Sequence, residues 1–299
     1  MKTRLLEGMR GAGVKKYKIA DVYLQVAGAD YQTVCEQMRA YEAHAPLQPD
    51  VSIEFCKSDP VLLPGGIRVY AADAGRYYFE MPDGYGFYDR IGQEPITCFT
   101  ADLACSRLTY RYCNMEQAIG VPDGTAVYNV LGNLFQQVLL HRGGVVIHAS
   151  AIAYRGQAVA FSAPSGTGKS THTALWKKYY PEVVQLNDDT PGLRMERGRC
   201  MAYGTPWSGK SSINCNLSAP LRALVFLERG TEDTIARITP FQAFGRLLSE
   251  IHLPISRHLT DLLAERLNCL VELVPAYVLR CGMTRRAVEV VREELFASG

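Results

Sequence analysis

The alternation of apolar and polar residues divides the chain into two parts of different character. Up to about residue 120, short runs alternate apolar and polar residues and are separated by Gly, Pro and Asp, a pattern typical of strands with one buried face. These runs are residues 21–28, 51–56, 66–73, 76–83, 94–100 and 106–113. Residues 31–44 have apolar residues at helical spacing instead. The pattern predicts a small antiparallel sheet with a helix, and no catalytic constellation is legible in it.

A turn with the sequence GVPDG, residues 120–124, is the predicted domain boundary. After it, residues 126–144 have apolar positions at helical spacing and end at a Gly pair. We therefore predict a small β-rich α+β domain over residues 1–122, which could recognise a substrate or partner, and an α/β domain over residues 123–299.

The second domain begins with a strand, loop, helix and strand. Two strand-like runs, residues 144–154 and 157–163, precede a Gly-rich loop, a helix over 170–180 and a further strand over 182–189. This order presents the loop at the end of a strand, where α/β sheets bind ligands. Later strands are expected at 221–230 and 274–282, and amphipathic helices at 240–254, 256–273 and 284–296.

Composition narrows the possible partners. Apolar residues make up 47% and charged residues 21% of 299, which is ordinary globular usage. A formal charge of +2 provides no long-range field for a polyanion, so we expect no nucleic-acid partner. Nine scattered cysteines without a C-x-x-C pair favour reduced thiols and a cytoplasmic location. Because no run of 18 apolar residues occurs, we expect no membrane partner either.

The loop Ala163–Ser170 fits the Walker A pattern with Ala in place of the first Gly. Its glycines allow backbone N–H groups to turn toward phosphate oxygens, its Lys reaches the outer phosphates, and its hydroxyl can hold magnesium. The sequence thus predicts ATP and Mg as cofactors. The expected nucleotide-binding residues are Ser165, Gly166, Thr167, Gly168, Lys169, Ser170 and Thr171.

A second match, Gly204–Ser211, fits the Walker A pattern better than the first. The residues after it contain Asn and Pro and lack a helical period, so no helix N-terminus completes an anion site there. We favour the first loop as the nucleotide cradle. The second is interpreted as a loop that brings Lys210 toward the same site, and an ordinary surface turn remains the alternative.

Acidic residues follow the strand after the loop, at Asp188 and Asp189. One carboxylate can hold the metal while the other accepts the proton of an attacking hydroxyl. The alternative is a plain turn before Pro191. His148 lies on the strand before the loop, where a lone His is more often a core residue, but its spacing to Lys169 favours a place in the site.

This arrangement resembles the HPr kinase/phosphorylase family over roughly residues 140–225, through "HASAIAYRGQAVAFSAPSGTGKS" and "QLNDDT". The resemblance implies a P-loop fold of the phosphoenolpyruvate-carboxykinase type. It also implies that Asp188 is the catalytic carboxylate, His148 its partner, Ser170 the magnesium hydroxyl and Asp189 a second metal-side carboxylate. Family members usually carry Glu directly after the loop Ser or Thr, where this chain has Thr171 and His172.

The segment "GTPWSGK" is more similar to small HPr-kinase-related kinases that modify peptides than to true HPr kinases. We therefore predict an ATP- and Mg-dependent kinase that phosphorylates a hydroxyl of a protein, peptide or small molecule. The resemblance to that group implies that the hydroxyl belongs to Ser, and we also predict that the chain can form a homo-oligomer. In this hypothesis Asp188, oriented by His148, is the base, and Lys210 neutralises the transferring phosphoryl group. The alternative is a nucleotide-binding regulatory or scaffold protein that transfers no phosphate.

Overall fold

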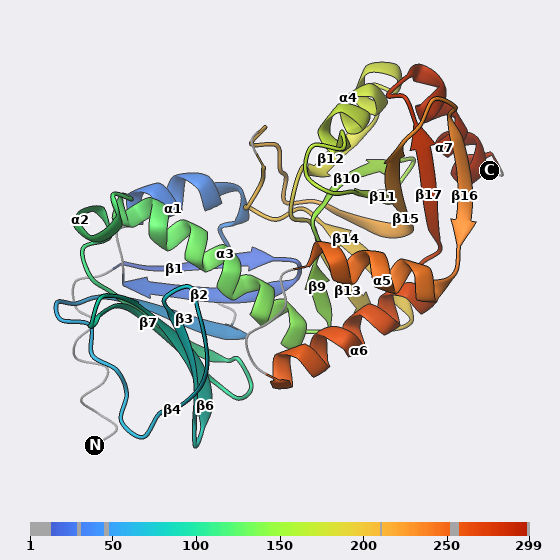
Figure 1. Cartoon of the computed structure of the whole chain (residues 1–299). Helices are drawn as coiled ribbons and strands as arrows, with labels where there is room; N and C mark the ends of the chain where they lie inside the picture. Colours follow the sequence, from blue (N-terminus) through green and yellow to red (C-terminus); the bar gives the residue numbers. More distant parts are fainter. Residues whose placement is uncertain (1–12, 29–30, 45–47, 210, 252–256, 298–299) are drawn as a thin grey trace. The chain divides into compact units, whose positions relative to one another are not determined.

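The computed structural model describes residues 13–28, 31–44, 48–209, 211–251 and 257–297. The chain forms two compact units, of which unit 1 ends at His141 and unit 2 begins at Arg142 (Figure 1). Both units combine sheets with helices, so the predicted α/β and α+β character is confirmed. The finer assignment of unit 2 to a particular type of phosphate-loop core stays a prediction.

Unit 1 contains an eight-stranded sheet with the strand order β1-β2-β3-β8-β7-β6-β5-β4. Its strands are β1 (Val14–Ile19), β2 (Val22–Gly28), β3 (Val51–Lys57), β4 (Arg68–Asp73), β5 (Arg76–Met81), β6 (Gly84–Ile91), β7 (Glu94–Asp102) and β8 (Arg107–Tyr112). Its helices are α1 (Tyr31–Met38), the 3₁₀ turn η1 (Arg39–Tyr41), α2 (Met115–Ile119) and α3 (Asp123–His141). The sheet is therefore larger than the six strands predicted.

The sheet of unit 1 is mixed, which corrects the expectation of a purely antiparallel one. β3 runs parallel to both β2 and β8, and the remaining neighbours are antiparallel. The chain leaves β2, passes through α1 and η1, and returns as β3. A connection of this length through a helix is what a parallel pair requires, because a tight hairpin can only join antiparallel strands.

Helix α3 clusters with unit 1, although the predicted boundary after residue 122 assigned it to the second domain. It packs against α1, and both lie on one face of the sheet (Figure 1). At its start the buried Asp123 accepts a hydrogen bond from the backbone N–H of Met115, at 2.8 Å, and forms an ion pair with Lys57 of β3. These contacts tie the first turn of α3 to unit 1.

The described residues of unit 2 form a nine-stranded sheet. Its strands are connected in the order β12-β10-β11-β15-β14-β13-β9, with β17 beside β15 and β16 beside β17. They are β9 (Gly144–Val146), β10 (Ala149–Tyr154), β11 (Gln157–Ser162), β12 (Val184–Asn187), β13 (Gly192–Glu196), β14 (Arg199–Tyr203), β15 (Ser218–Arg229), β16 (Thr234–Ile238) and β17 (Ala276–Cys281). The helices are α4 (Lys169–Tyr179), α5 (Pro240–Glu250), α6 (Arg257–Leu273) and α7 (Arg285–Phe296).

Three central strands of unit 2 end at the same edge. β11, β15 and β17 are parallel, while β10 is antiparallel to both β11 and β12. The carboxyl ends of β11 and β12 and the start of β10 therefore meet at one edge of the sheet. In open α/β sheets this is the edge at which ligands bind.

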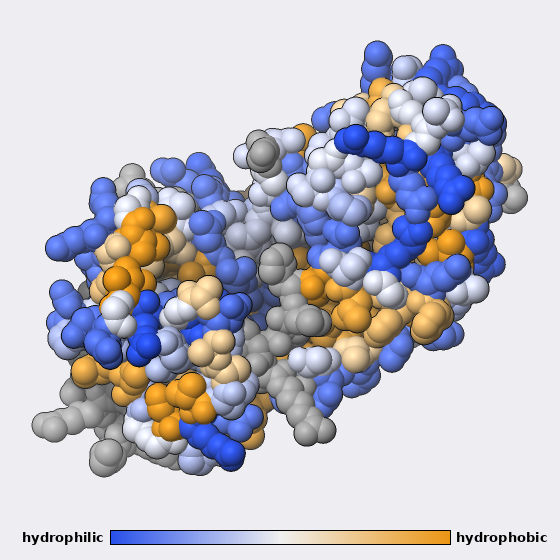
Figure 2. Space-filling model, viewed as in Figure 1, coloured by the Kyte–Doolittle hydropathy of each residue, from blue (hydrophilic) through white to orange (hydrophobic). Residues whose placement is uncertain are grey.

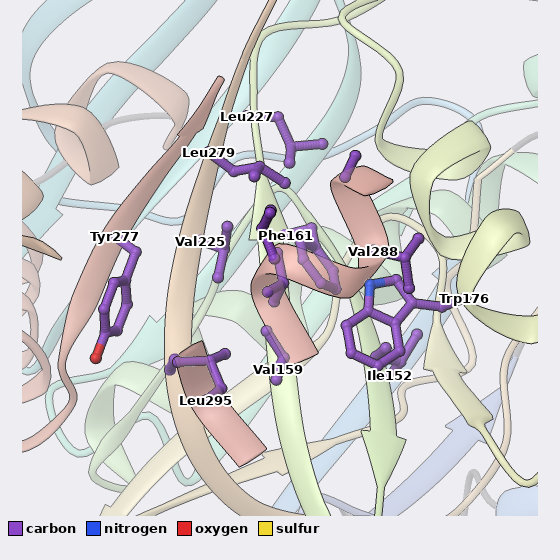
Figure 3. Close-up of a cluster of buried hydrophobic side chains, with 14 of the residues drawn as sticks. Ile152, Val159, Phe161, Trp176, Val225, Leu227, Tyr277, Leu279, Val288 and Leu295 are labelled. Atoms are coloured by element: carbon purple, nitrogen blue, oxygen red, sulfur yellow. The ribbon is translucent and has the colours of Figure 1, made fainter. Parts of the chain in front are cut away.

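A hydrophobic core between the sheet and helices α4 and α7 fixes this edge (Figure 3). Val159 and Phe161 of β11 are fully buried, as expected for alternate residues that point to one face of a strand. Trp176 of α4 is fully buried beside them, with its ring centroid 6.3 Å from that of Phe161. The loop between β11 and α4 is thereby held between two well-packed elements.

The other helices cover different strands. α5 packs against β17, and α6 packs against β9, β13 and β14. Apolar side chains reach the surface over α5 and α6 (orange in Figure 2), where Phe241 and Leu248 are exposed. Over the described ranges, no helix has both the length and the apolar character that crossing a membrane requires.

Candidate functional site

The loop predicted to bind phosphate lies where the sequence placed it, between β11 and α4. It begins with a turn in which the N–H of Thr167 donates to the carbonyl of Pro164, at 3.2 Å. Gly168 then adopts a left-handed conformation, with φ 116°, and α4 begins at Lys169. A side chain at Gly168 would be strained by this φ and would also come 2.7 Å from Cε of Met283.

The start of α4 presents free donors to the loop. No side chain of the described residues caps the helix. The first backbone N–H groups of a helix have no intrahelical partner and carry a partial positive charge, so such an end attracts an anion. Ser165, Gly166, Ser170 and Thr171 are exposed around it, and Thr167 is half-buried.

Lys169 is buried beneath this loop, with 8% of its surface exposed. Its Nζ donates to the carbonyl of Ala163 at 2.6 Å. Burial lowers the pKa of Lys169, and the negative charges of Asp189 and Glu250 oppose that shift. The ammonium group is therefore close to two carboxylates and has one hydrogen bond to a carbonyl that a phosphate could replace.

Strand register brings His148 and the acidic pair to the same edge. Ala149 pairs with Ser162 at the end of β11, and Ala151 pairs with Asn187 at the end of β12. Ser162 Oγ donates to the carbonyl of His148 at 3.0 Å, and the N–H of Ala149 donates to the carbonyl of Asp189 at 2.9 Å. The three sequence motifs are thus next to one another in the folded chain.

His148 is held between two carboxylates. Its Nε2 lies 3.2 Å from Oδ1 of Asp189, and its Nδ1 lies 3.4 Å from Oε2 of Glu250. The hydrogen bond to Asp189 raises the pKa of His148, against the opposing effects of burial and of the Lys169 charge. The same hydrogen bond lowers the pKa of Asp189. The geometry favours an imidazolium paired with an ionised Asp189.

The expected pairing of His148 with Asp188 differs from the observed one. Asp188 is 3% exposed, and its Oδ1 accepts the backbone N–H of Gly209 at 2.7 Å. Both carboxylates lie in the bend after β12, which is closed by the N–H groups of Asp189 and Thr190 donating to the side chain of Asn187. Asp189 is the one that faces His148, and 38% of its side chain is exposed.

The second Gly-rich loop lies against the acidic turn. The buried Asn187 donates to the carbonyl oxygens of Thr205 and Trp207, at 3.0 and 2.9 Å. It also accepts the backbone N–H groups of Asp189 and Thr190, at 2.8 and 2.7 Å. Asn187 therefore fixes the turn and the loop to each other. Lys210, predicted to reach the site, lies outside the described residues.

Two residues at this edge were not among the predicted ones. Glu250, the last residue of α5, contacts His148, and no motif in its helix indicates a role. Arg229, the last residue of β15, donates from its guanidinium to the carbonyl of Gly166 at 2.9 Å. A polar residue at the carboxyl end of an apolar strand is a signal that could have indicated Arg229.

His172, near the place where the resembled family has Glu, is a core residue. It is fully buried, its ring lies 4.7 Å from that of Phe161, and its Nε2 accepts from Nε1 of Trp176 at 3.1 Å. Burial lowers the pKa of His172 to about 4, so the ring is neutral at pH 7. Because its ring is fully buried and its Nε2 is bonded to Trp176, His172 is not placed to supply a metal-side group. The described part of the chain contains no cluster of three or more metal-binding side chains.

Fold and site together define unit 2 as an α/β domain with a loop suited to phosphate beside a His–Asp pair. The family model for the SynChlorMet cassette protein ScmC matches residues 125–296, more than half of the chain. The chain therefore belongs to the ScmC family. No curated protein matches it.

Among solved structures, one similar chain is the Hpr(Ser) kinase/phosphatase from Coxiella burnetii, with 14% sequence identity. The match covers 50% of this chain and 95% of that one, with a TM-score of 0.29. At that score the two backbones do not superpose well enough for anything further to follow.

Proposed function

We propose that the protein is an ATP- and Mg-dependent kinase that transfers the γ-phosphoryl group to a hydroxyl of a protein, peptide or small molecule. One observation carries the proposal: the loop with the buried Lys169 and the His148–Asp189 pair lie at the same sheet edge. The charge of Asp189 acts on both Lys169 and His148, so the two halves of the site are electrostatically connected. Phosphoryl transfer depends on such positioning and charge neutralisation.

The loop and the start of α4 would bind the nucleotide. Backbone N–H groups of residues 165–171 would donate to phosphate oxygens, and Lys169 would leave the carbonyl of Ala163 for a phosphate. Ser170 and Asp188 offer the oxygen ligands that magnesium prefers, together with the phosphates. Bound there, the cation would neutralise charge on the transferring group.

In the transfer step we assign the role of general base to Asp189. Asp189 is partly exposed and paired with His148, whereas Asp188 is buried. The acceptor oxygen forms a bond to the γ-phosphorus while the bond from that phosphorus to the β,γ-bridging oxygen breaks. ADP leaves with the bonding electron pair, and the hydroxyl proton passes to the free oxygen of Asp189. His148 holds the other oxygen of the carboxylate in place.

The test uses purified protein, magnesium and ATP labelled in the γ-phosphate, with and without extract from its own cell. Label is followed in protein, peptide and small-molecule fractions, beside the Asp189→Asn variant. Label in a discrete acceptor with wild type, and its loss in the variant, supports a kinase and identifies the acceptor class. ATP binding with no labelled acceptor under any condition would favour a regulatory nucleotide-binding protein instead.

A further inference from the structure

Glu250 is positioned to control the orientation of His148. It is the last residue of α5, and only 15% of its side chain is exposed. Its Oε2 lies 3.4 Å from Nδ1 of His148, on the side of the ring opposite Asp189. The imidazole thus has a carboxylate at each nitrogen.

The charge of Glu250 is not neutralised by its own helix. Arg246, one turn earlier on α5, pairs with Glu228 of β15 at 2.6 Å. A carboxylate with little exposure requires a nearby positive partner, because removing its charge from water is otherwise costly. The positive groups that act with Glu250 are His148 and Lys169, both at the candidate site.

We propose that Glu250 is a positioning residue of the site: by holding Nδ1 of His148 it keeps Nε2 on Asp189. The proposal rests on the kinase function proposed above for its kinetic consequence, but the contact itself does not. A ring with one nitrogen released can rotate about its terminal torsion, which is broad for His. In metal sites, the outer hydrogen-bond partners of His residues fix the orientation of the ring in this way.

The decisive variant is Glu250→Gln, which keeps the side-chain shape and removes the charge. The matched control is Glu272→Gln, which removes the same charge from an exposed position in the last turn of α6. The first readout is the pair of His148 ring-nitrogen signals in ¹⁵N-labelled protein, assigned by their absence in His148→Gln. The second readout is the rate of label transfer, with the dissociation constant for MgATP measured separately.

With Glu250→Gln we expect a shifted Nδ1 signal of His148 and a transfer rate lower by about 10- to 100-fold. MgATP affinity should change by much less than the transfer rate, because Glu250 contacts His148 and acts on Lys169 only through its charge. Glu272→Gln should leave the His148 ring-nitrogen signals, the transfer rate and the MgATP affinity unchanged. If Glu250→Gln does not fold, as judged by circular dichroism, Glu250→Asp replaces it.

Three results would overturn the proposal: a His148 signal like that of the control, an unchanged transfer rate, or a loss of MgATP affinity equal to the loss of rate. If wild type transfers no phosphate to any acceptor, the kinase function fails. The ring-nitrogen signals then still decide whether Glu250 holds His148, so the two failures are distinguishable.

Discussion

His148 contacts Asp189 and not its neighbour Asp188: Nε2 lies 3.2 Å from Oδ1 of Asp189. Asp188 instead accepts the N–H of Gly209. The adjacent carboxylates therefore have different surroundings: Asp189 is partly exposed and paired with a titratable ring, and Asp188 is buried against a backbone amide. Such a difference in environment separates the tasks that two neighbouring carboxylates can perform.

The first prediction separates these tasks. Asp189→Asn should lower the rate of phosphoryl transfer by about 10²- to 10⁴-fold, the usual contribution of a general base, with MgATP affinity within about threefold of wild type. Asp188→Asn should instead weaken MgATP binding, because it removes the carboxylate assigned to the metal. For both variants, the transfer rate is measured by label transfer and the MgATP affinity by calorimetric titration.

The opposite pattern, with Asp188→Asn losing only the rate and Asp189→Asn losing MgATP affinity, would restore the assignment predicted from sequence. Asp261→Asn on α6 is a suitable control, since Asp261 is exposed and lies on a helix that packs against β9, β13 and β14. It should leave both quantities unchanged.

Lys169 is predicted to contribute to the affinity for ATP but not to the stability of the fold. Lys169→Met keeps most of the side-chain volume and removes the charge, so ATP affinity should fall by at least about tenfold, the equivalent of about 1.4 kcal/mol. The free energy of unfolding should change little, because relief of the cost of burying the ammonium offsets the loss of its attraction to Asp189 and Glu250. Lys177→Met, at an exposed position of the same helix, should affect neither ATP titration nor denaturant unfolding.

The strand, loop, helix and strand around the Gly-rich loop of unit 2 could be predicted because each of these elements has a clear local signal, whereas β13, β14 and β16 were not predicted. The apolar run of β11, the glycines of the loop and the period of α4 fall where the sequence indicated.

In unit 1, the sequence pattern did not predict strand β6, because Gly84 and Gly86 are typical of a turn. In the structure a Cβ at either position would overlap a backbone carbonyl of β7, so these glycines allow close strand pairing.

The contacts of the site depend on register and long-range packing, which the sequence does not show. The acidic residues lie in the bend after β12, where the N–H groups of Asp189 and Thr190 donate to the side chain of Asn187. The N–H of Ala149 then donates to the carbonyl of Asp189, which holds this bend beside His148. Glu250 reaches the site only because α5 packs beside β17, far along the chain from His148.

The burial of His172 predicts that the free energy of unfolding decreases in acid. Because burial lowers its folded pKa to about 4, below the usual value of 6.5, the unfolded chain binds its proton first as the pH falls. Stability from the neutral ring is thus complete above about pH 6.5 and is lost as the pH falls toward 4, a change of about 3 kcal/mol.

The measurement is denaturant unfolding between pH 4 and 7, compared between wild type and His172→Gln. The variant should have a shallower dependence of its unfolding free energy on pH, whatever its stability at pH 7. Other titrating groups are common to both proteins and cancel in the difference. Equal slopes would show that His172 is not the neutral buried ring seen beside Trp176.

Substitution by Ala should change the free energy of unfolding in opposite directions at Gly204 and at Gly245. A Cβ at Gly204 would overlap the carbonyl oxygen of Cys215, where the second loop passes closely over its neighbour. Gly204→Ala must move one of the two backbones, which we expect to cost about 1–3 kcal/mol of stability, as overpacking usually does. Because Asn187 ties this loop to the acidic turn, MgATP affinity should fall as well.

At Gly245, inside α5, a Cβ would meet no described atom within 4 Å. Gly245→Ala should therefore raise the free energy of unfolding by up to about 1 kcal/mol, because Ala loses less backbone entropy in a helix than Gly does. It should leave MgATP affinity unchanged. Both variants are compared by denaturant unfolding and calorimetric titration, and a stable Gly204→Ala protein with normal affinity would mean that the close approach at residue 204 is not required for the site.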